Sequence, residues 1–194
     1  DFYTNAVAMG DVDSDGDLDL LVSNGGAKEL LLNNGLGSFS TASGFPGGSA
    51  DTYAMAMGDV DGDGDLDLLF GNIDGANQLL LNDGLGSFST ASDFPGGGAG
   101  TRAVAMGDVD SDGDLDLLFG NGARYWGAGN ELLLNDGLGS FSAASGFPGG
   151  GANTMAVAMG DVDGDGDLDL LIGNEGSNEL LLNDGLGAFS AADG

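Results

Sequence analysis

Aspartate residues fill four short segments of this sequence and are spaced like the ligands of a metal ion. Each segment reads Asp-Val-Asp-x-Asp-Gly-Asp-Leu-Asp, at residues 11–19, 59–67, 108–116 and 161–169. Carboxylates at alternate positions of a tight loop converge on one point, the glycine allows a sharp turn, and the seventh residue can offer its carbonyl. Six or seven oxygen ligands in flexible geometry suit Ca²⁺ better than Mg²⁺. The spacing therefore predicts four Ca²⁺ ions, one per segment.

All twenty aspartates of these loops are candidate metal ligands. They are Asp11, Asp13, Asp15, Asp17, Asp19, Asp59, Asp61, Asp63, Asp65, Asp67, Asp108, Asp110, Asp112, Asp114, Asp116, Asp161, Asp163, Asp165, Asp167 and Asp169. The chain has no Cys and no His, which argues against zinc, copper and iron sites. An EF-hand shares the first six positions but needs a Glu at the twelfth. The twelfth positions here are apolar: Val22, Phe70, Phe119 and Ile172.

Solvated acidic turns are the plainer interpretation of such loops, and four copies in phase argue against it. Repulsion gives a second argument. Two carboxylates about 4 Å apart repel by roughly 4 kcal/mol at an effective dielectric constant of ~20. Four loops of crowded carboxylates would offset much of the ~5–15 kcal/mol that stabilises a typical domain. We therefore expect calcium to be part of the fold.

Composition limits the classes of partner and the compartment. The chain has 194 residues, 40 of them Gly, and a formal net charge of −29. Such acidity disfavours nucleic acid and anionic membranes as partners, while 41% hydrophobic residues disfavour intrinsic disorder. No signal peptide or membrane span is visible, and the start at Asp1 suggests a processed or excised segment. Low-affinity carboxylate sites work at extracellular calcium levels, so we expect a secreted or cell-surface location.

The acidic loops recur at intervals of 48, 49 and 53 residues, which is typical of propellers and solenoids. Each repeat contains four segments with strand patterns. The first strands are expected at residues 6–9, 54–57, 103–106 and 156–159, and the second at 18–22, 66–70, 115–119 and 168–172. Leucine triplets at 30–32, 79–81, 132–134 and 180–182 form the third, and serine-phenylalanine segments around Phe39, Phe88, Phe141 and Phe189 form the fourth.

These patterns predict an all-β array of four antiparallel blades with a calcium loop between the first two strands of each. The leucine triplets are too short for helices. The second and third strands are apolar on consecutive residues, so both faces of each sheet must be covered. We expect a single repeat domain, 1–194, with blades at 1–49, 50–98, 99–151 and 152–194. Gly/Pro/Ser/Ala connectors lead from each blade to the next.

The combination of motifs resembles the FG-GAP/VCBS repeat. Its parts are a small apolar strand ending in Met-Gly, the Asp loop, an apolar strand into Gly-Asn, and Leu-Leu-Leu-Asn-Asp-Gly-x-Gly-x-Phe. The family builds the β-propellers of integrin α subunits and of many secreted proteins. The resemblance covers essentially the whole chain and implies Ca²⁺ bound by the alternate aspartates of each loop. Family propellers usually have seven blades, whereas this chain supplies four.

The number of blades does not decide how they assemble. A compact four-bladed ring is slightly favoured, because one side of the first strands carries only alanine and would fit a narrow axis. Units stacked along an open axis, or several chains together, are the alternatives. An unclosed array would expose leucine-rich terminal blades and give a homo-oligomer or a filament.

The third repeat differs from the others by an insertion at residues 122–129, which holds Arg124, Tyr125 and the only tryptophan, Trp126. An exposed loop of this kind could stack on a sugar or anchor a protein. Packing of Trp126 over a blade edge is an equal alternative.

No nucleophile and base pair can be assembled without His or Cys. The acids outside the loops, such as Glu29, Glu131, Glu175 and Glu179, are scattered. We therefore expect a non-enzymatic, calcium-stabilised extracellular module for structure or adhesion, with a protein or glycan partner at the cell surface or matrix. A carbohydrate-binding lectin and an accessory domain of a larger secreted enzyme are the alternatives.

Overall fold

The computed structural model describes residues 3–97, 100–122 and 129–192, which form four blades of four strands. The first strands are β1 (Thr4–Gly10), β5 (Thr52–Gly58), β9 (Thr101–Gly107) and β13 (Thr154–Gly160). The second are β2 (Asp19–Asn24), β6 (Asp67–Asn72), β10 (Asp116–Asn121) and β14 (Asp169–Asn174). The third are β3 (Ala27–Asn33), β7 (Gln78–Asn82), β11 (Glu131–Asn135) and β15 (Glu179–Asn183), and the fourth are β4 (Phe39–Thr41), β8 (Phe88–Thr90), β12 (Phe141–Ala143) and β16 (Phe189–Ala191).

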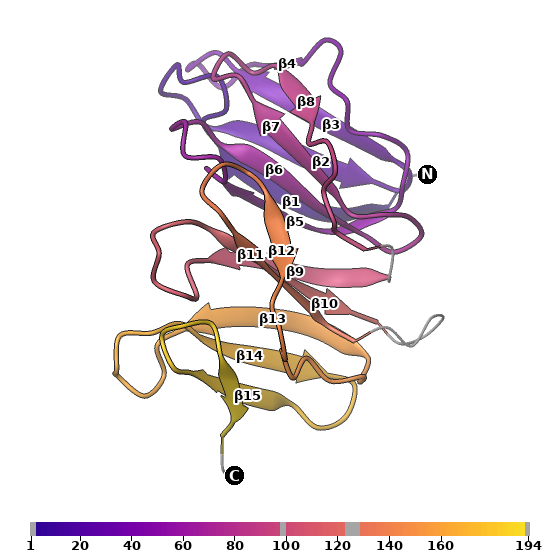
Figure 1. The fold of residues 1–194 in the computed structure, drawn as a ribbon. Coiled ribbons are helices and arrows are strands. Elements are labelled where there is room, and N and C mark those ends of the chain that lie inside the picture. The colour runs from indigo at the N-terminus through magenta and orange to yellow at the C-terminus, as the bar shows by residue number, and fades with distance from the viewer. Residues whose placement is uncertain (1–2, 98–99, 123–128, 193–194) are drawn as a thin grey trace.

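Each blade is an antiparallel sheet whose strands follow chain order, as β1-β2-β3-β4 does in the first. The four sheets are stacked one after another (Figure 1). First strands of consecutive blades lie against each other, with β5 between β1 and β9. This confirms the predicted all-β blades. Within the described ranges, the chain has no helix with the length and hydrophobicity needed to span a membrane.

The core lies between blades, because each sheet has two apolar faces. We call the face toward the following blade the forward face and the face toward the preceding blade the rear face. Three clusters repeat one pattern, a forward valine and two leucines against three large rear residues. They are Val12, Leu21 and Leu30 against Leu68, Phe70 and Leu80; Val60, Leu69 and Leu79 against Leu117, Phe119 and Leu133; and Val109, Leu118 and Leu132 against Leu170, Ile172 and Leu181.

The array is open, so the slightly favoured ring of four blades is wrong. The fourth blade lies at the opposite end of the stack from the first (Figure 1). No described strand of the first blade packs on one of the fourth as consecutive blades pack. Stacked sheets lie about 10 Å apart, and the contacts between first strands run from β1 to β5, β9 and β13 without returning to β1.

An asparagine at the end of each third strand links consecutive blades. Asn135 donates from Nδ2 to the carbonyl of Val60 in the preceding blade, at 2.8 Å, and to Leu115 in its own blade, at 3.0 Å. Asn82 and Asn183 make the same pair of bonds. Asn33 has no preceding blade within the chain, and its Nδ2 donates only to Leu18.

This difference gives a matched pair of variants. Replacing Asn135 by alanine leaves the buried Val60 carbonyl without its donor, a loss of about 1–3 kcal/mol in the free energy of unfolding. Asn33→Ala removes only the bond within the blade, so we expect a smaller loss. Urea unfolding of both variants measures the difference. Equal losses would show that the bond between blades contributes nothing.

Candidate metal centres

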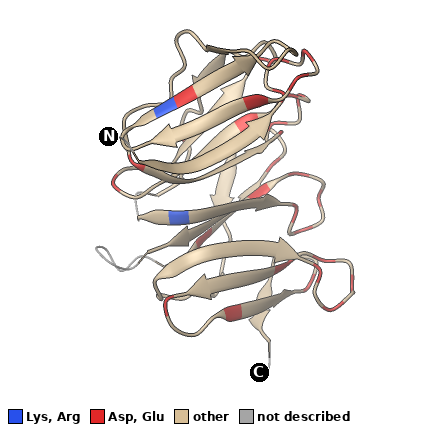
Figure 2. Cartoon of the chain, turned by 180° about the vertical axis from the view of Figure 1, so that it is seen from behind, with Lys and Arg blue, Asp and Glu red and all other residues tan. Residues whose placement is uncertain are grey.

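The four acidic loops connect the first strand of each blade to the second, and they lie on the same side of the stack (Figure 2). The strand pair ends at Gly10 opposite Asp19 in the first blade, and at the equivalent positions in the others. The sheet therefore fixes both ends of each loop. Four equivalent acidic sites follow from four equivalent hairpins.

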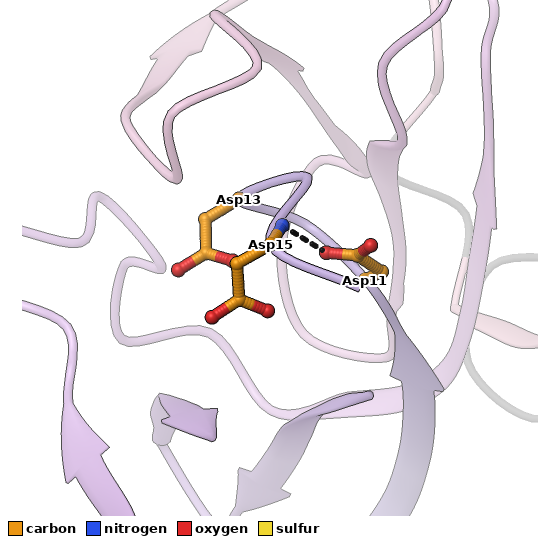
Figure 3. Close-up of side chains that lie close together, drawn as sticks. All are labelled: Asp11, Asp13 and Asp15. Atoms are coloured by element: carbon orange, nitrogen blue, oxygen red, sulfur yellow. Dashed lines mark hydrogen bonds between the residues drawn. The ribbon is translucent and has the colours of Figure 1, made fainter. Parts of the chain in front are cut away.

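Hydrogen bonds from backbone N–H groups to aspartate side chains shape each loop. In the first blade, the Asp11 carboxylate accepts from the backbone N–H of Asp15, at 3.1 Å (Figure 3). It also accepts from the backbone N–H of Gly16, at 2.9 Å. Asp15 in turn accepts from the N–H of Asp17, at 2.9 Å. Gly16 has φ of 94°, which a side chain would strain. The turn that the sequence predicted at the sixth position is therefore present.

Three carboxylates converge in each loop, with ligand oxygens within 4.8 Å of one another. The groups are Asp11, Asp13 and Asp15; Asp59, Asp61 and Asp67; Asp108, Asp110 and Asp116; and Asp161, Asp163 and Asp169. The first and third positions belong to every group. The ninth joins them in three blades and the fifth in one.

The seventh position does not join these groups. The carboxylates of Asp17, Asp65, Asp114 and Asp167 lie instead beside the turn glycines Gly35, Gly84, Gly137 and Gly185. The sequence assigned this position a carbonyl ligand, and the side-chain placement is compatible with that assignment. The fifth-position residues Asp63, Asp112 and Asp165 each accept the N–H two residues on, as Asp15 does.

The ninth-position aspartate also supports the blade. Asp67 is fully buried, and its two oxygens accept from the N–H groups of Val60, at 2.9 Å, and Asn82, at 2.9 Å. Burial raises the pKa of Asp67 to about 6, although these two bonds act to lower it. Asp116 has the equivalent bonds, to Val109 and Asn135, and burial likewise raises its pKa to about 6. The sequence identified these residues as ligands and gave no sign of their second role.

The third-position aspartates meet the next blade. Oδ1 of Asp13, Asp61 and Asp110 is buried without a hydrogen-bond donor. A β-carbon placed on Gly86, Gly139 or Gly187 of the following blade would lie 3.3–3.4 Å from the β-carbon of the facing aspartate. Burial, and then the neighbouring carboxylates, raise the pKa of Asp61 and Asp110 above its usual range. A buried carboxylate oxygen without a donor is costly unless a cation contacts it.

These observations fit a hard divalent cation. The convergent donors are all oxygens. Burial, and then neighbouring carboxylates, raise the pKa of Asp61 and Asp110, and Asp13, Asp61 and Asp110 each have an unpartnered oxygen. Ca²⁺ accepts six to eight oxygens in variable geometry, so the first, third, fifth and ninth side chains with the seventh carbonyl would hold it.

Other residues singled out in the sequence stand apart from these loops. Arg124, Tyr125 and Trp126 lie outside the described residues. Glu131 accepts from the N–H of Gly97, at 3.4 Å, and Glu175 accepts from Asn153, at 2.6 Å. The interblade asparagines were missed as functional residues. Their signal was present, because Asn33, Asn82, Asn135 and Asn183 recur at one position of every repeat.

Comparisons with known proteins identify the repeat by sequence and the fold by structure. The model of the FG-GAP-like repeat matches residues 11–70, 59–119, 122–172 and 161–193. Among solved structures, an Agrocybe aegerita lectin specific for non-reducing terminal N-acetylglucosamine aligns with a TM-score of 0.64 and 21% identity, over 96% of this chain and 51% of the lectin. BBS1N, solved in complex with ARL6DN, aligns with a TM-score of 0.59 and 12% identity, over 97% of this chain and 55% of its own.

The chain thus spans about half the length of the solved structures it matches. At these identities the likeness concerns the fold. A search of curated proteins finds no match.

Proposed function

Because this chain belongs to the FG-GAP-like repeat family, we propose that it is a non-catalytic, calcium-stabilised extracellular module that serves structure or adhesion. The observation that carries the proposal is the convergence of three carboxylates in every loop, with an unpartnered buried oxygen at three blade contacts. A cation there would neutralise the loop and support the next blade. Millimolar extracellular calcium suits multi-carboxylate sites of this kind.

Calcium would act here as a structural ion. It supplies charge neutralisation and coordination, and this chain's residues supply the frame. The Asp11 carboxylate holds the loop closed through two N–H groups, and Asp19 joins the loop to the third strand by accepting from Val12 and Asn33. Metal binding and blade packing are therefore parts of one folding unit, and an adhesive surface would be rigid only when calcium is bound.

Calorimetric titration with CaCl₂ at neutral pH tests the proposal. We expect about four calcium ions per chain, and about three for the double variant Asp59→Ala/Asp61→Ala, which removes two converging ligands of the second loop. Ser145→Ala, at an exposed position of the connector after β12, is a control that should keep four. Absence of binding in millimolar calcium would reject the calcium role, and with it the proposed function.

Glycan binding is a second candidate, favoured by a hollow of about 240 Å³ between the second and third blades. It is lined by the connector residues Ser92, Asp93, Phe94 and Pro95 and by Gly139, Ser140 and Phe141. Serine hydroxyls and a carboxylate beside aromatic rings are the groups that bind sugars in shallow sites. The similarity to a lectin concerns the fold alone at 21% identity. Binding to a glycan array, lost in Asp93→Ala, would favour this candidate over the structural one.

A further inference from the structure

The asparagine at the end of a third strand contacts the acidic loops of two blades with one side-chain nitrogen. Nδ2 of Asn135 donates to the carbonyl of Val60, in the loop of the second blade, and to the carbonyl of Leu115, in the loop of the third. Each carbonyl belongs to the planar peptide unit that leads into the next residue. Those residues are Asp61 and Asp116, and both belong to converging carboxylate groups. One side chain therefore orients a candidate metal ligand in each of two consecutive loops.

The asparagine is itself held in place. Its two side-chain N–H groups bond to these carbonyls, and its Oδ1 accepts from the N–H of Gly137, at 3.2 Å. Its backbone N–H donates to Oδ1 of Asp116, at 2.9 Å, while the N–H of Val60 donates to Oδ2 of Asp67, at 2.9 Å. Hydrogen bonds thus connect the ninth-position aspartate of the third loop with that of the second, through Asn135 and Val60.

The same connection is present at the other two contacts between blades. Asn82 joins Val12 to Leu66, at 2.9 and 3.0 Å, and Asn183 joins Val109 to Leu168, at 2.7 and 3.0 Å. In each case the peptide unit held in the preceding loop leads into the third-position aspartate, whose Oδ1 is buried without a hydrogen-bond donor. The four loops are therefore joined, one to the next, by three equivalent asparagines.

We propose that Asn82, Asn135 and Asn183 are positioning residues for the loops that they join, and that they make calcium binding at consecutive loops positively cooperative. This inference rests on the proposed calcium role. An ion in one loop fixes its ninth-position aspartate, and with it the backbone of the asparagine that donates to this aspartate. The asparagine then holds the third-position aspartate of the preceding loop in place, so that loop loses less conformational entropy when its own ion binds. By linkage, the preceding loop has the same effect on the following one.

Repulsion between the ions of consecutive loops opposes this coupling. The repulsion is weak, because stacked sheets lie about 10 Å apart and physiological salt screens exposed charges over about 8 Å. We therefore expect the ordering by the asparagine to decide the sign of the coupling.

Calcium titration followed by NMR correlation spectra of the backbone amides measures each loop separately. The N–H of the sixth-position glycine donates to the first-position aspartate of its own loop, at 2.9–3.1 Å. The reporters are Gly16, Gly64, Gly113 and Gly166. In the unaltered chain, we expect the four resonances to shift together, with a Hill coefficient above unity.

Asn135→Ala removes the two side-chain bonds and keeps the backbone donor. We expect the calcium concentration at half-saturation to rise by roughly fivefold or more at Gly64 and Gly113, and to change less at the other two reporters. Asn77→Ala is the matched control, because Nδ2 of Asn77 donates to Oγ1 of Thr101 across the same pair of blades, at 2.9 Å, and at the end of the strands away from the loops. The control should leave all four reporters unchanged.

The double variant Asp59→Ala/Asp61→Ala tests the coupling without altering an asparagine. Removing two of the five carboxylates leaves the second loop with the charge that it has when calcium is bound, so its electrostatic effect on neighbouring loops is that of the filled loop. We expect roughly fivefold weaker binding at Gly16 and Gly113, because the second loop is no longer ordered by an ion. Gly166 should change least.

These variants separate the coupling from the calcium role itself. Unchanged affinities at Gly16 and Gly113 in the loop variant, or equal effects of Asn135→Ala and Asn77→Ala, would overturn the cooperativity and leave the calcium role intact. Resonances that do not shift in millimolar calcium would overturn both. Circular dichroism checks that each variant is folded, and the loop variant alone decides if Asn135→Ala does not fold.

Discussion

Removing calcium with excess chelator at neutral pH is expected to lower the unfolding temperature by on the order of 15 °C. A site at ten times its dissociation constant stabilises the folded state by about 1.4 kcal/mol, so four sites contribute roughly 6 kcal/mol. In a chain of this size, 1 kcal/mol corresponds to about 2–4 °C. The loss follows from the crowded oxygens, since each loop gathers three carboxylates within 4.8 Å. Thermal melting followed by circular dichroism, with and without chelator, measures it.

Two comparisons make this result specific to the loops. Added Ca²⁺ should restore the unfolding temperature, and Mg²⁺ at the same concentration should restore less of it, because Mg²⁺ requires octahedral geometry and retains its waters. The variant Asp59→Ala/Asp61→Ala should show a smaller difference between calcium and chelator than the unaltered chain. Identical melting curves in calcium and chelator would contradict a structural role for the ion.

The repeat made most of this fold predictable from sequence. The blades follow from patterns that lie within 50 or so residues of each other, such as the alternating first strand and the apolar runs at Leu20 and Leu30. The glycine turn at Gly16 was predictable for the same reason, because the strain of its φ is a local property. Local features repeated four times leave few alternative arrangements.

What the sequence did not reveal depends on contacts between blades. Asn135 bonds to Val60, 75 residues away, and its recurrence in every repeat does not say which blade it bonds to. The ring was wrongly favoured because closure depends on how consecutive sheets are rotated against each other, which the patterns within one repeat do not specify. The set of converging carboxylates also depended on geometry, since Asp15 and Asp63 accept equivalent backbone N–H groups, yet only Asp15 joins the converging group of its loop.

Stability should depend on pH with opposite sign in chelator and in calcium. Burial raises the pKa of Asp67 and Asp116 to about 6 in the folded chain, above the value of about 3.9 expected in the unfolded chain. Between these values the metal-free folded state holds more protons than the unfolded state, so its stability falls as pH rises from about 4 to 6. The difference is on the order of 3 kcal/mol for each carboxyl. In calcium, protons compete with the ion, so stability should instead rise with pH over this window.

Urea unfolding at several pH values between 4 and 7, in chelator and in saturating calcium, measures both slopes. Asp116→Asn removes one of the carboxyls whose pKa is raised to about 6, so the slope in chelator should become shallower, whatever the variant's overall loss of stability. Asp93→Asn, at an exposed position of the connector after β8, should leave that slope unchanged. A metal-free chain that loses stability on acidification from pH 7 to 5 would contradict the prediction. Its ninth-position carboxylates would then be charged and satisfied by their two N–H donors alone, and calcium would not be needed to stabilise them.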